Sequence, residues 1–132
     1  MAQGAAPAAA AALCALVFLV LARGHILAPG DGLVTIPMRA WWWEHWRFGG
    51  GWNPWVFGGY PSDADPGQAP YYVLNALYAV LDPRWATNAV VIATYALAAL
   101  GAALYVRSLG ARGPGVVCAG LAYSLCGVLP AH

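Results

Sequence analysis

Residues 86–106 read ATNAVVIATYALAALGAALYV, an unbroken run without a charged side chain. Arg107 follows directly and ends the run. A helix needs about 20 apolar residues to cross the hydrocarbon core of a bilayer. The run therefore predicts a membrane-spanning helix, and the rest of the chain is best interpreted around it.

The composition of the whole chain agrees with a membrane environment. Hydrophobic residues make up 61% of the 132 residues and charged residues only 8%, whereas a typical soluble domain is about 25% charged. All six basic residues are arginine, and a net charge of +1 leaves no basic surface for nucleic acid. The three cysteines lie in apolar runs, so we interpret them as small packing residues rather than metal or redox groups.

Two further apolar runs predict additional spans. The first covers residues 8–28 if Arg23 and His25 lie at the interface. A cleaved signal peptide is the alternative, which the lack of a basic residue before the run disfavours. The other run covers residues 114–130 and starts at Pro114, a favourable first helical residue. The sequence thus predicts an all-α integral membrane protein, a single membrane domain with about three transmembrane helices.

The arginine positions predict the orientation of these spans. The short loop after residue 106 contains Arg107 and Arg112 and no acid, whereas residues 29–85 contain every acidic residue of the chain. Short loops rich in arginine face the cytoplasm under the positive-inside rule. We therefore expect the N-terminus inside and residues 29–85 outside.

The outer segment is rich in aromatic residues and contains all seven tryptophans. Tryptophan concentrates at the level of the lipid headgroups. Residues 34–48, with Pro37 in the first turn, are expected to form an interfacial helix anchored by its tryptophans. Residues 70–81 are too short to span and are expected to form a second interfacial or re-entrant helix. Between them lies GGGWNPWVFGGYP, residues 49–61, which is expected to form turns at the lipid boundary.

Asp31 is the acidic residue of greatest chemical interest. It lies between two glycines just beyond the first predicted span, and an ionisable group near a bilayer is costly and often functional. Its carboxylate could act as a general base or help hold a divalent cation. It could instead cap the following helix, and the spacing alone favours the cap.

Other polar residues also allow two interpretations. Asp63 and Asp65 have a spacing at which two carboxylates can share a cation, although the same residues are typical of a solvated turn. Arg39 and Arg47 could bind phosphate oxygens or extend toward lipid headgroups. The pair Glu44–His45 lacks a second histidine at ligand spacing, so no zinc site is expected.

Several motifs follow one another within the outer segment. They are Gly30-Asp31-Gly32, Pro37, Trp52-Asn53-Pro54, Phe57-Gly58-Gly59-Tyr60-Pro61 and the pattern D-P-x-Q-x-x-x-Y from Asp65 to Tyr72. This order resembles the N-terminal region of YfhO-type bacterial membrane proteins, which are multispanning proteins of the GT-C glycosyltransferase class. The resemblance covers roughly residues 8–130.

The resemblance implies transfer of a sugar from a polyprenyl-phosphate carrier to an acceptor at the outer face of the bacterial inner membrane. It implies that Asp31 is the catalytic base, often with a divalent cation such as Mg²⁺ or Mn²⁺. Asp63 and Asp65, singled out by their spacing, are auxiliary candidates for binding that metal or the acceptor. Five residues of the outer segment would contact substrate: Arg39, Arg47, Trp52, Asn53 and Tyr60. Proteins of this class are much longer, so we expect the chain to be an N-terminal portion that is inactive by itself.

A second hypothesis belongs to a different functional class. The chain would be a small, non-enzymatic three-span membrane protein whose tryptophan-rich outer segment binds a partner or anchors at the interface. A secreted protein with a cleaved leader is a third possibility, which the uncharged run at 86–106 disfavours.

Overall fold

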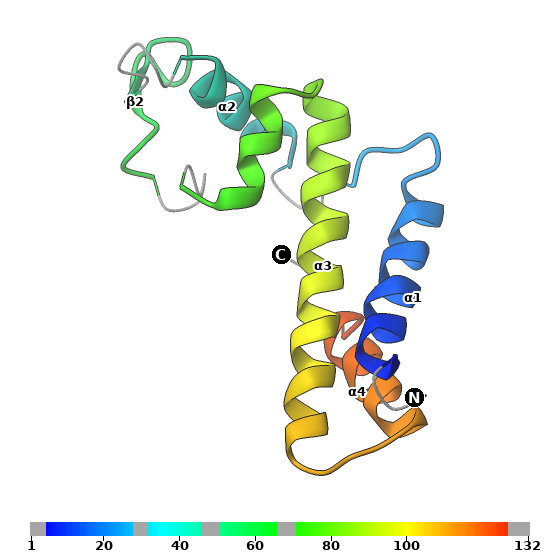
Figure 1. The fold of residues 1–132 in the computed structure, drawn as a ribbon. Coiled ribbons are helices and arrows are strands. Elements are labelled where there is room, and N and C mark those ends of the chain that lie inside the picture. Colours follow the sequence, from blue (N-terminus) through cyan, green and yellow to red (C-terminus); the bar gives the residue numbers. More distant parts are fainter. Residues whose placement is uncertain (1–4, 28–31, 46–50, 66–70, 127–132) are drawn as a thin grey trace. The chain divides into compact units, whose positions relative to one another are not determined.

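A computed structural model of the chain describes residues 5–27, 32–45, 51–65 and 71–126 (Figure 1). The described residues are mostly helical. They divide into two compact units, the first made of residues 1–27 and 91–132 and the second of residues 28–90.

Three helices build the first unit: α1 (Ala6–Leu21), the later part of α3 (Pro83–Ser108) and α4 (Pro114–Ser124). Each has a proline in its first two positions, where the missing N–H costs no hydrogen bond and the fixed φ suits a helix. At the start of α3, the Asp82 side chain also accepts a hydrogen bond from Arg84 N at 2.9 Å. Asp82-Pro83 therefore begins a helix as well as ending the preceding segment.

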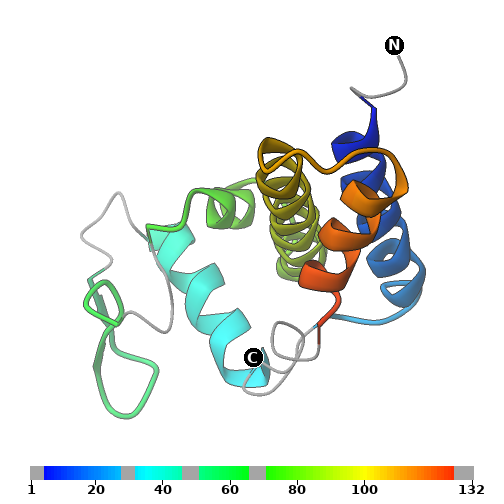
Figure 2. The same cartoon turned by 90° about the horizontal axis from the view of Figure 1, so that it is seen from below.

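The three helices meet through small residues spaced four apart. The buried positions are Ala10 and Cys14 on α1, Ala99 and Ala103 on α3, and Val116, Gly120 and Ser124 on α4. A Cβ atom added to Gly120 would lie 2.7 Å from the Ala99 carbonyl oxygen and 2.9 Å from the Ala10 Cβ. The helices therefore approach to backbone contact at Gly120, and Figure 2 shows them gathered side by side.

Large apolar side chains of the same helices point outward. Five of them are each between 48% and 55% exposed: Leu16, Leu19, Val20, Leu97 and Leu104. A helix of a water-soluble bundle normally turns its large apolar side chains toward the core. The first unit differs from this pattern: apart from Phe18 and Val116, its buried positions are mostly small residues, and most of its leucines are exposed.

By length and composition, the structure supports one of the three predicted spans. Of the described helices, α3 alone is long and apolar enough to cross a membrane; its 26 residues measure about 39 Å. By contrast, α1 has 16 residues, about 24 Å, and ends at Leu21 rather than at residue 28, because a turn with Gly24 at φ +77° follows. The third predicted span, 114–130, is helical to Ser124, and its residues 127–130 lie outside the described residues.

In the second unit, α2 (Gly32–His45) and the 3₁₀ helix η4 (Val73–Ala79) pack with the first turns of α3. Tyr78, Ala86 and Val90 form its buried apolar cluster. The Tyr78 hydroxyl lies 2.8 Å from Thr87 Oγ1. The Thr87 hydroxyl in turn donates a hydrogen bond to the Pro83 carbonyl oxygen at 2.6 Å. The hydroxyl groups of Tyr78 and Thr87 are thereby satisfied inside the unit.

Both predicted interfacial helices differ in detail from the structure. Helix α2 starts two residues earlier than expected, so Pro37 lies inside it rather than in its first turn. The segment predicted as a helix over 70–81 is a short 3₁₀ helix. Trp42 is only 9% exposed and Trp43 packs against the apolar cluster of the unit. These tryptophans therefore fill the core of the second unit rather than serving only as lipid anchors.

A small antiparallel ribbon departs from the all-α prediction. Strands β1 (Trp52–Asn53) and β2 (Tyr60–Pro61) pair so that Trp52 faces Pro61 and Asn53 faces Tyr60. Both strands belong to the glycine- and proline-rich stretch that was predicted to form turns only.

The helix contact at Gly120 gives the first prediction. Gly120→Ala should destabilise the first unit by about 1–3 kcal/mol, because the added methyl group meets a backbone carbonyl that cannot move independently. The matched control is Gly101→Ala on α3, where an added Cβ has no atom within 4 Å; helix propensity should make this change neutral or stabilising by about 0.5–1 kcal/mol. Unfolding in detergent micelles, followed by circular dichroism, measures both. Equal stability of the two variants would contradict the contact.

Candidate functional site

The candidate site is the aromatic hairpin, which we define as residues 51–65. Asn53 is 1% exposed, and its Oδ1 accepts a hydrogen bond from Trp55 N at 3.0 Å. Such a bond from an Asn side chain to the backbone two residues later stabilises a turn. Gly59 N donates to Val56 O at 2.9 Å at the other side of the loop. Local hydrogen bonds therefore hold the loop that joins β1 and β2.

The return of the hairpin requires left-handed backbone conformations. Phe57, Gly58 and Gly59 have φ of +53°, +78° and +128°. This region costs glycine little, whereas for Phe57 the strain is of the order of 1 kcal/mol. The Trp52 ring lies directly over Gly59, and a Cβ there would be 2.8 Å from the ring atom Cε2. Gly59 is thus required both by the backbone and by the tryptophan that covers it.

The hairpin exposes its largest side chains. Trp55 is 84% exposed, Phe57 82% and Trp52 60%. Phe57 also makes an edge-to-face contact with Tyr60, with ring centroids 5.9 Å apart. Exposed apolar side chains gathered on one short element mark a surface that contacts a membrane or a partner.

The two predicted metal-ligand candidates each have a partner within the hairpin. The Tyr60 hydroxyl donates to Asp65 Oδ2 at 2.6 Å. The Asp63 carboxylate lies against Gly51, where an added Cβ would be 2.7 Å from Asp63 Oδ2. Ala64 N donates to Pro61 O at 3.1 Å, which closes a turn around Asp63. The turn interpretation of these acids therefore describes their backbone, and the divalent cation stays a prediction.

The hydrogen bond to Asp65 raises the pKa of Tyr60 above its ordinary value of 10.0. Partial desolvation and repulsion between the carboxylate and a developing phenolate act in the same direction. The neutral, hydrogen-bonded tyrosine is therefore the form that the folded hairpin favours.

The remaining predicted site residues are not brought together by the described structure. Asp31 and Arg47 lie outside the described residues. Arg39 lies half-buried on α2. His45 stacks on Trp41 with ring centroids 4.6 Å apart, and its Nδ1 lies 2.9 Å from the Trp41 carbonyl oxygen. Across the described part of the chain, no group of three or more His, Cys, Asp or Glu residues could hold a metal ion.

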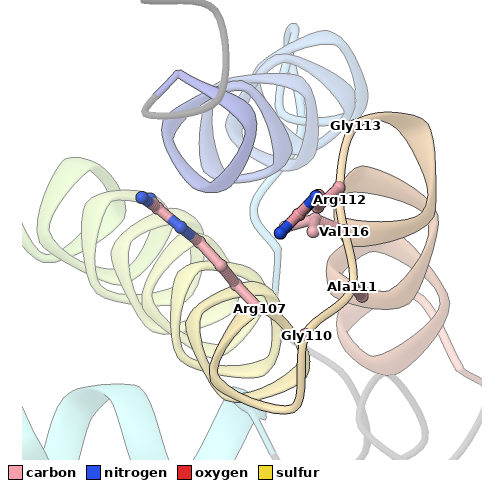
Figure 3. A pocket seen from close by; sticks show the side chains of 6 residues that line it. All are labelled: Arg107, Gly110, Ala111, Arg112, Gly113 and Val116. Carbon is pink, nitrogen blue, oxygen red and sulfur yellow. The ribbon is translucent and has the colours of Figure 1, made fainter.

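The first unit contains a cavity that was not predicted from the sequence. A cavity of about 160 Å³ opens at the loop between α3 and α4, with Arg107 and Arg112 in its lining (Figure 3). The sequence assigned these two arginines only to membrane orientation. Its sole signal was their proximity in a glycine-containing loop without acids.

Comparisons of the chain with family models, with curated proteins and with solved structures found no match in any of the three. The resemblance to GT-C glycosyltransferases therefore stays a prediction that rests on the motifs quoted above. The function is accordingly proposed from the chain's own residues and geometry.

The contact between Tyr60 and Asp65 gives a prediction about pH. Because the pKa of Tyr60 is raised in the folded hairpin, the contact stabilises the hairpin below pH 10.0 and is lost as the pH rises through the raised value. Asp65→Asn should return the ionisation of Tyr60 toward its ordinary range. The difference in tyrosinate absorbance between each protein and its Tyr60→Phe counterpart isolates this titration. The same midpoint with and without the Asp65 carboxylate would contradict the assignment.

Proposed function

We propose that the chain is an integral membrane protein whose first unit lies in the bilayer. The observation that carries the proposal is the distribution of side chains on α1, α3 and α4, with mostly small residues between the helices beside Phe18 and Val116, and most leucines outside. Membrane helices associate through small residues spaced four apart, because lipid solvates large apolar side chains as well as a protein core does. In water, the exposed leucines would cost about 25 cal/mol for each Å² of apolar surface.

The charges of the first unit support the same proposal. Its sequence contains three arginines and no acid, and each arginine lies at or beyond a helix end: Arg23 after α1, and Arg107 and Arg112 around the α3–α4 loop. Ala6 and Ala111 pack on the same apolar cluster, so α1 begins at the end of the unit where this loop lies. The positive-inside rule then favours a cytoplasmic loop and a cytoplasmic start of α1.

The short length of α1 is compatible with this placement. Its length of about 24 Å is several ångströms less than a typical hydrocarbon core of about 30 Å. Local thinning of the bilayer and extension of flanking side chains accommodate such a mismatch at modest cost. The charged side chain of Arg23 follows the helix after one residue and suits that role.

For the second unit we propose a place at the interface between the membrane and water on the outer face, where the aromatic hairpin contacts the lipid. Tryptophan combines an apolar ring with a polar N–H and prefers the headgroup region. Trp52, Trp55 and Phe57 supply a large exposed aromatic surface, while the acidic residues Asp63 and Asp65 lie at the base of the hairpin. This arrangement supports anchoring through one edge of the hairpin.

The more specific proposal is that the chain is the N-terminal part of a GT-C-like glycosyltransferase. Its support is the order of motifs in the sequence, of which WNP begins on β1 and FGGYP ends on β2. Asp31 would take the proton of an acceptor hydroxyl, whose oxygen then forms a bond to the anomeric carbon of the sugar. The bond from that carbon to the polyprenyl phosphate breaks, with inversion, and the phosphate leaves as the anion.

The non-enzymatic alternative has its own supporting observation. The aromatic hairpin exposes side chains that suit anchoring or partner binding without any chemistry. The two proposals share the membrane location and differ in whether Asp31 is essential to an activity.

The interfacial position of the hairpin can be tested with an environment-sensitive fluorophore. In a background with all three cysteines replaced by alanine, Phe57→Cys carries the label at the exposed edge and Ala64→Cys carries it in the turn at the base. In vesicles, the label at position 57 should show blue-shifted emission and protection from an aqueous quencher, because it enters the headgroup region. The label at position 64 should behave as in water. Water-like emission at both positions would contradict the proposal.

The proposed catalytic role can be tested with Asp31→Asn in the complete reading frame, reconstituted with a polyprenyl-phosphate-linked sugar. A general base contributes about 10²–10⁴-fold, so sugar transfer should fall by at least about 100-fold. Glu44→Gln, at an exposed position on α2, is the control and should keep its activity. Unchanged transfer by Asp31→Asn would remove this residue from the mechanism. A wild-type protein that anchors but transfers no sugar would favour the non-enzymatic alternative.

A further inference from the structure

The cavity at the α3–α4 loop, which we call the arginine pocket, is lined by Arg107, Gly110, Ala111, Arg112, Gly113 and Val116. Figure 3 shows the two arginine side chains on the same side of the loop, one extending from the last turn of α3 and one from the loop itself. Two arginine residues therefore line one small pocket.

No carboxylate of the first unit can neutralise these charges. Residues 1–27 and 91–132 contain no aspartate or glutamate. Arg107 is explained in part by its place in the last turn of α3, where a cation complements the helix dipole. Arg112 lies outside any helix, so the dipole of α3 does not account for it. Two like charges side by side favour an anion between them.

The backbone of the loop adds to the positive potential. Gly110 and Gly113 have φ of +96° and +59°, and such conformations turn the chain sharply between the two helices. Gly113 is the N-cap of α4 and supplies no side chain to the first N–H groups of that helix. The start of α4 thus lies in the wall of the pocket with its partial positive charge uncapped by any side chain.

We propose that the arginine pocket binds a phosphate group, with Arg107 and Arg112 holding its oxygens from two sides. Arginine binds phosphate oxygens through two parallel N–H groups, which suits a small pocket better than a single point charge would. The phosphate has two sources, the headgroup of an anionic lipid or a free phosphate ion. The exposed side chains of Tyr105 and Leu109, close in sequence to the lining residues, suit the acyl chains of a lipid and so favour the headgroup as the source. Only this lipid source rests on the proposed membrane location.

The experiment measures binding to the detergent-solubilised full chain by native mass spectrometry. The probes are short-chain phosphatidylglycerol, phosphatidylcholine of the same chain length, and inorganic phosphate. Phosphatidylglycerol should bind with one-to-one stoichiometry, and Arg107→Gln or Arg112→Gln should each weaken it by at least about tenfold, since each removes a charged, bidentate contact. Arg23→Gln is the matched control, because Arg23 belongs to the same unit but is not part of the lining.

Two results support the site and two overturn it. Competition by inorganic phosphate at concentrations similar to the lipid assigns the site to a free phosphate ion, whereas a clear preference for phosphatidylglycerol assigns it to a headgroup. Equal binding by the wild type and the double variant Arg107→Gln/Arg112→Gln overturns the proposal. An equal loss in Arg23→Gln also overturns it, because the effect would then reflect net charge alone. The helical content of each variant is measured in the same detergent, together with its incorporation into phosphatidylcholine vesicles. These controls separate a loss of phosphate binding from a failure to fold or insert.

Discussion

The approach of three helix backbones at Gly120 is the constraint on which the first unit depends. Ala10, Ala99 and Ala103 leave no room for a side chain at that point, so the helices can come together only where all of them carry small residues. Close packing of small residues turns the larger leucines and valines outward. The resulting surface is apolar, and its charged residues are confined to helix ends. This is the surface that the proposed placement of the unit in a bilayer would expose to lipid.

The second unit differs from the first because some of its aromatic side chains are buried in its core and others are held exposed. Trp42 and Tyr78 take part in the interior, while the hairpin fixes Trp52, Trp55 and Phe57 on the outside by local hydrogen bonds and left-handed turns. The left-handed conformations of the loop cost conformational free energy and fix the positions of its side chains. Strained backbone of this kind is common at functional sites.

Sequence patterns predicted the elements that depend on composition and missed those that depend on turns and tertiary contacts. The run at 86–106 predicted most of α3, because a long uncharged stretch has few alternatives. The end of α1 was placed too late, since hydropathy continues past Gly24 although the backbone turns there. The pairing of β1 with β2 is too short to show a periodicity. At the candidate site, the sequence singled out Tyr60 and Asp65 but did not predict the hydrogen bond between them. The arginine pocket forms only when the end of α3, the loop and the start of α4 come together in the folded chain, so the sequence did not predict it.

The contact at Gly120 also constrains the order of assembly during synthesis. Helix α4 follows α1 and α3 along the chain, so both of the surfaces that it joins are made before it is. Until α4 leaves the ribosome, the small-residue stripes of α1 and α3 lack the partner that fits between them. Helix α4 therefore closes the packing of the first unit, because its Gly120 contacts Ala10 on α1 and both Ala99 and Ala103 on α3.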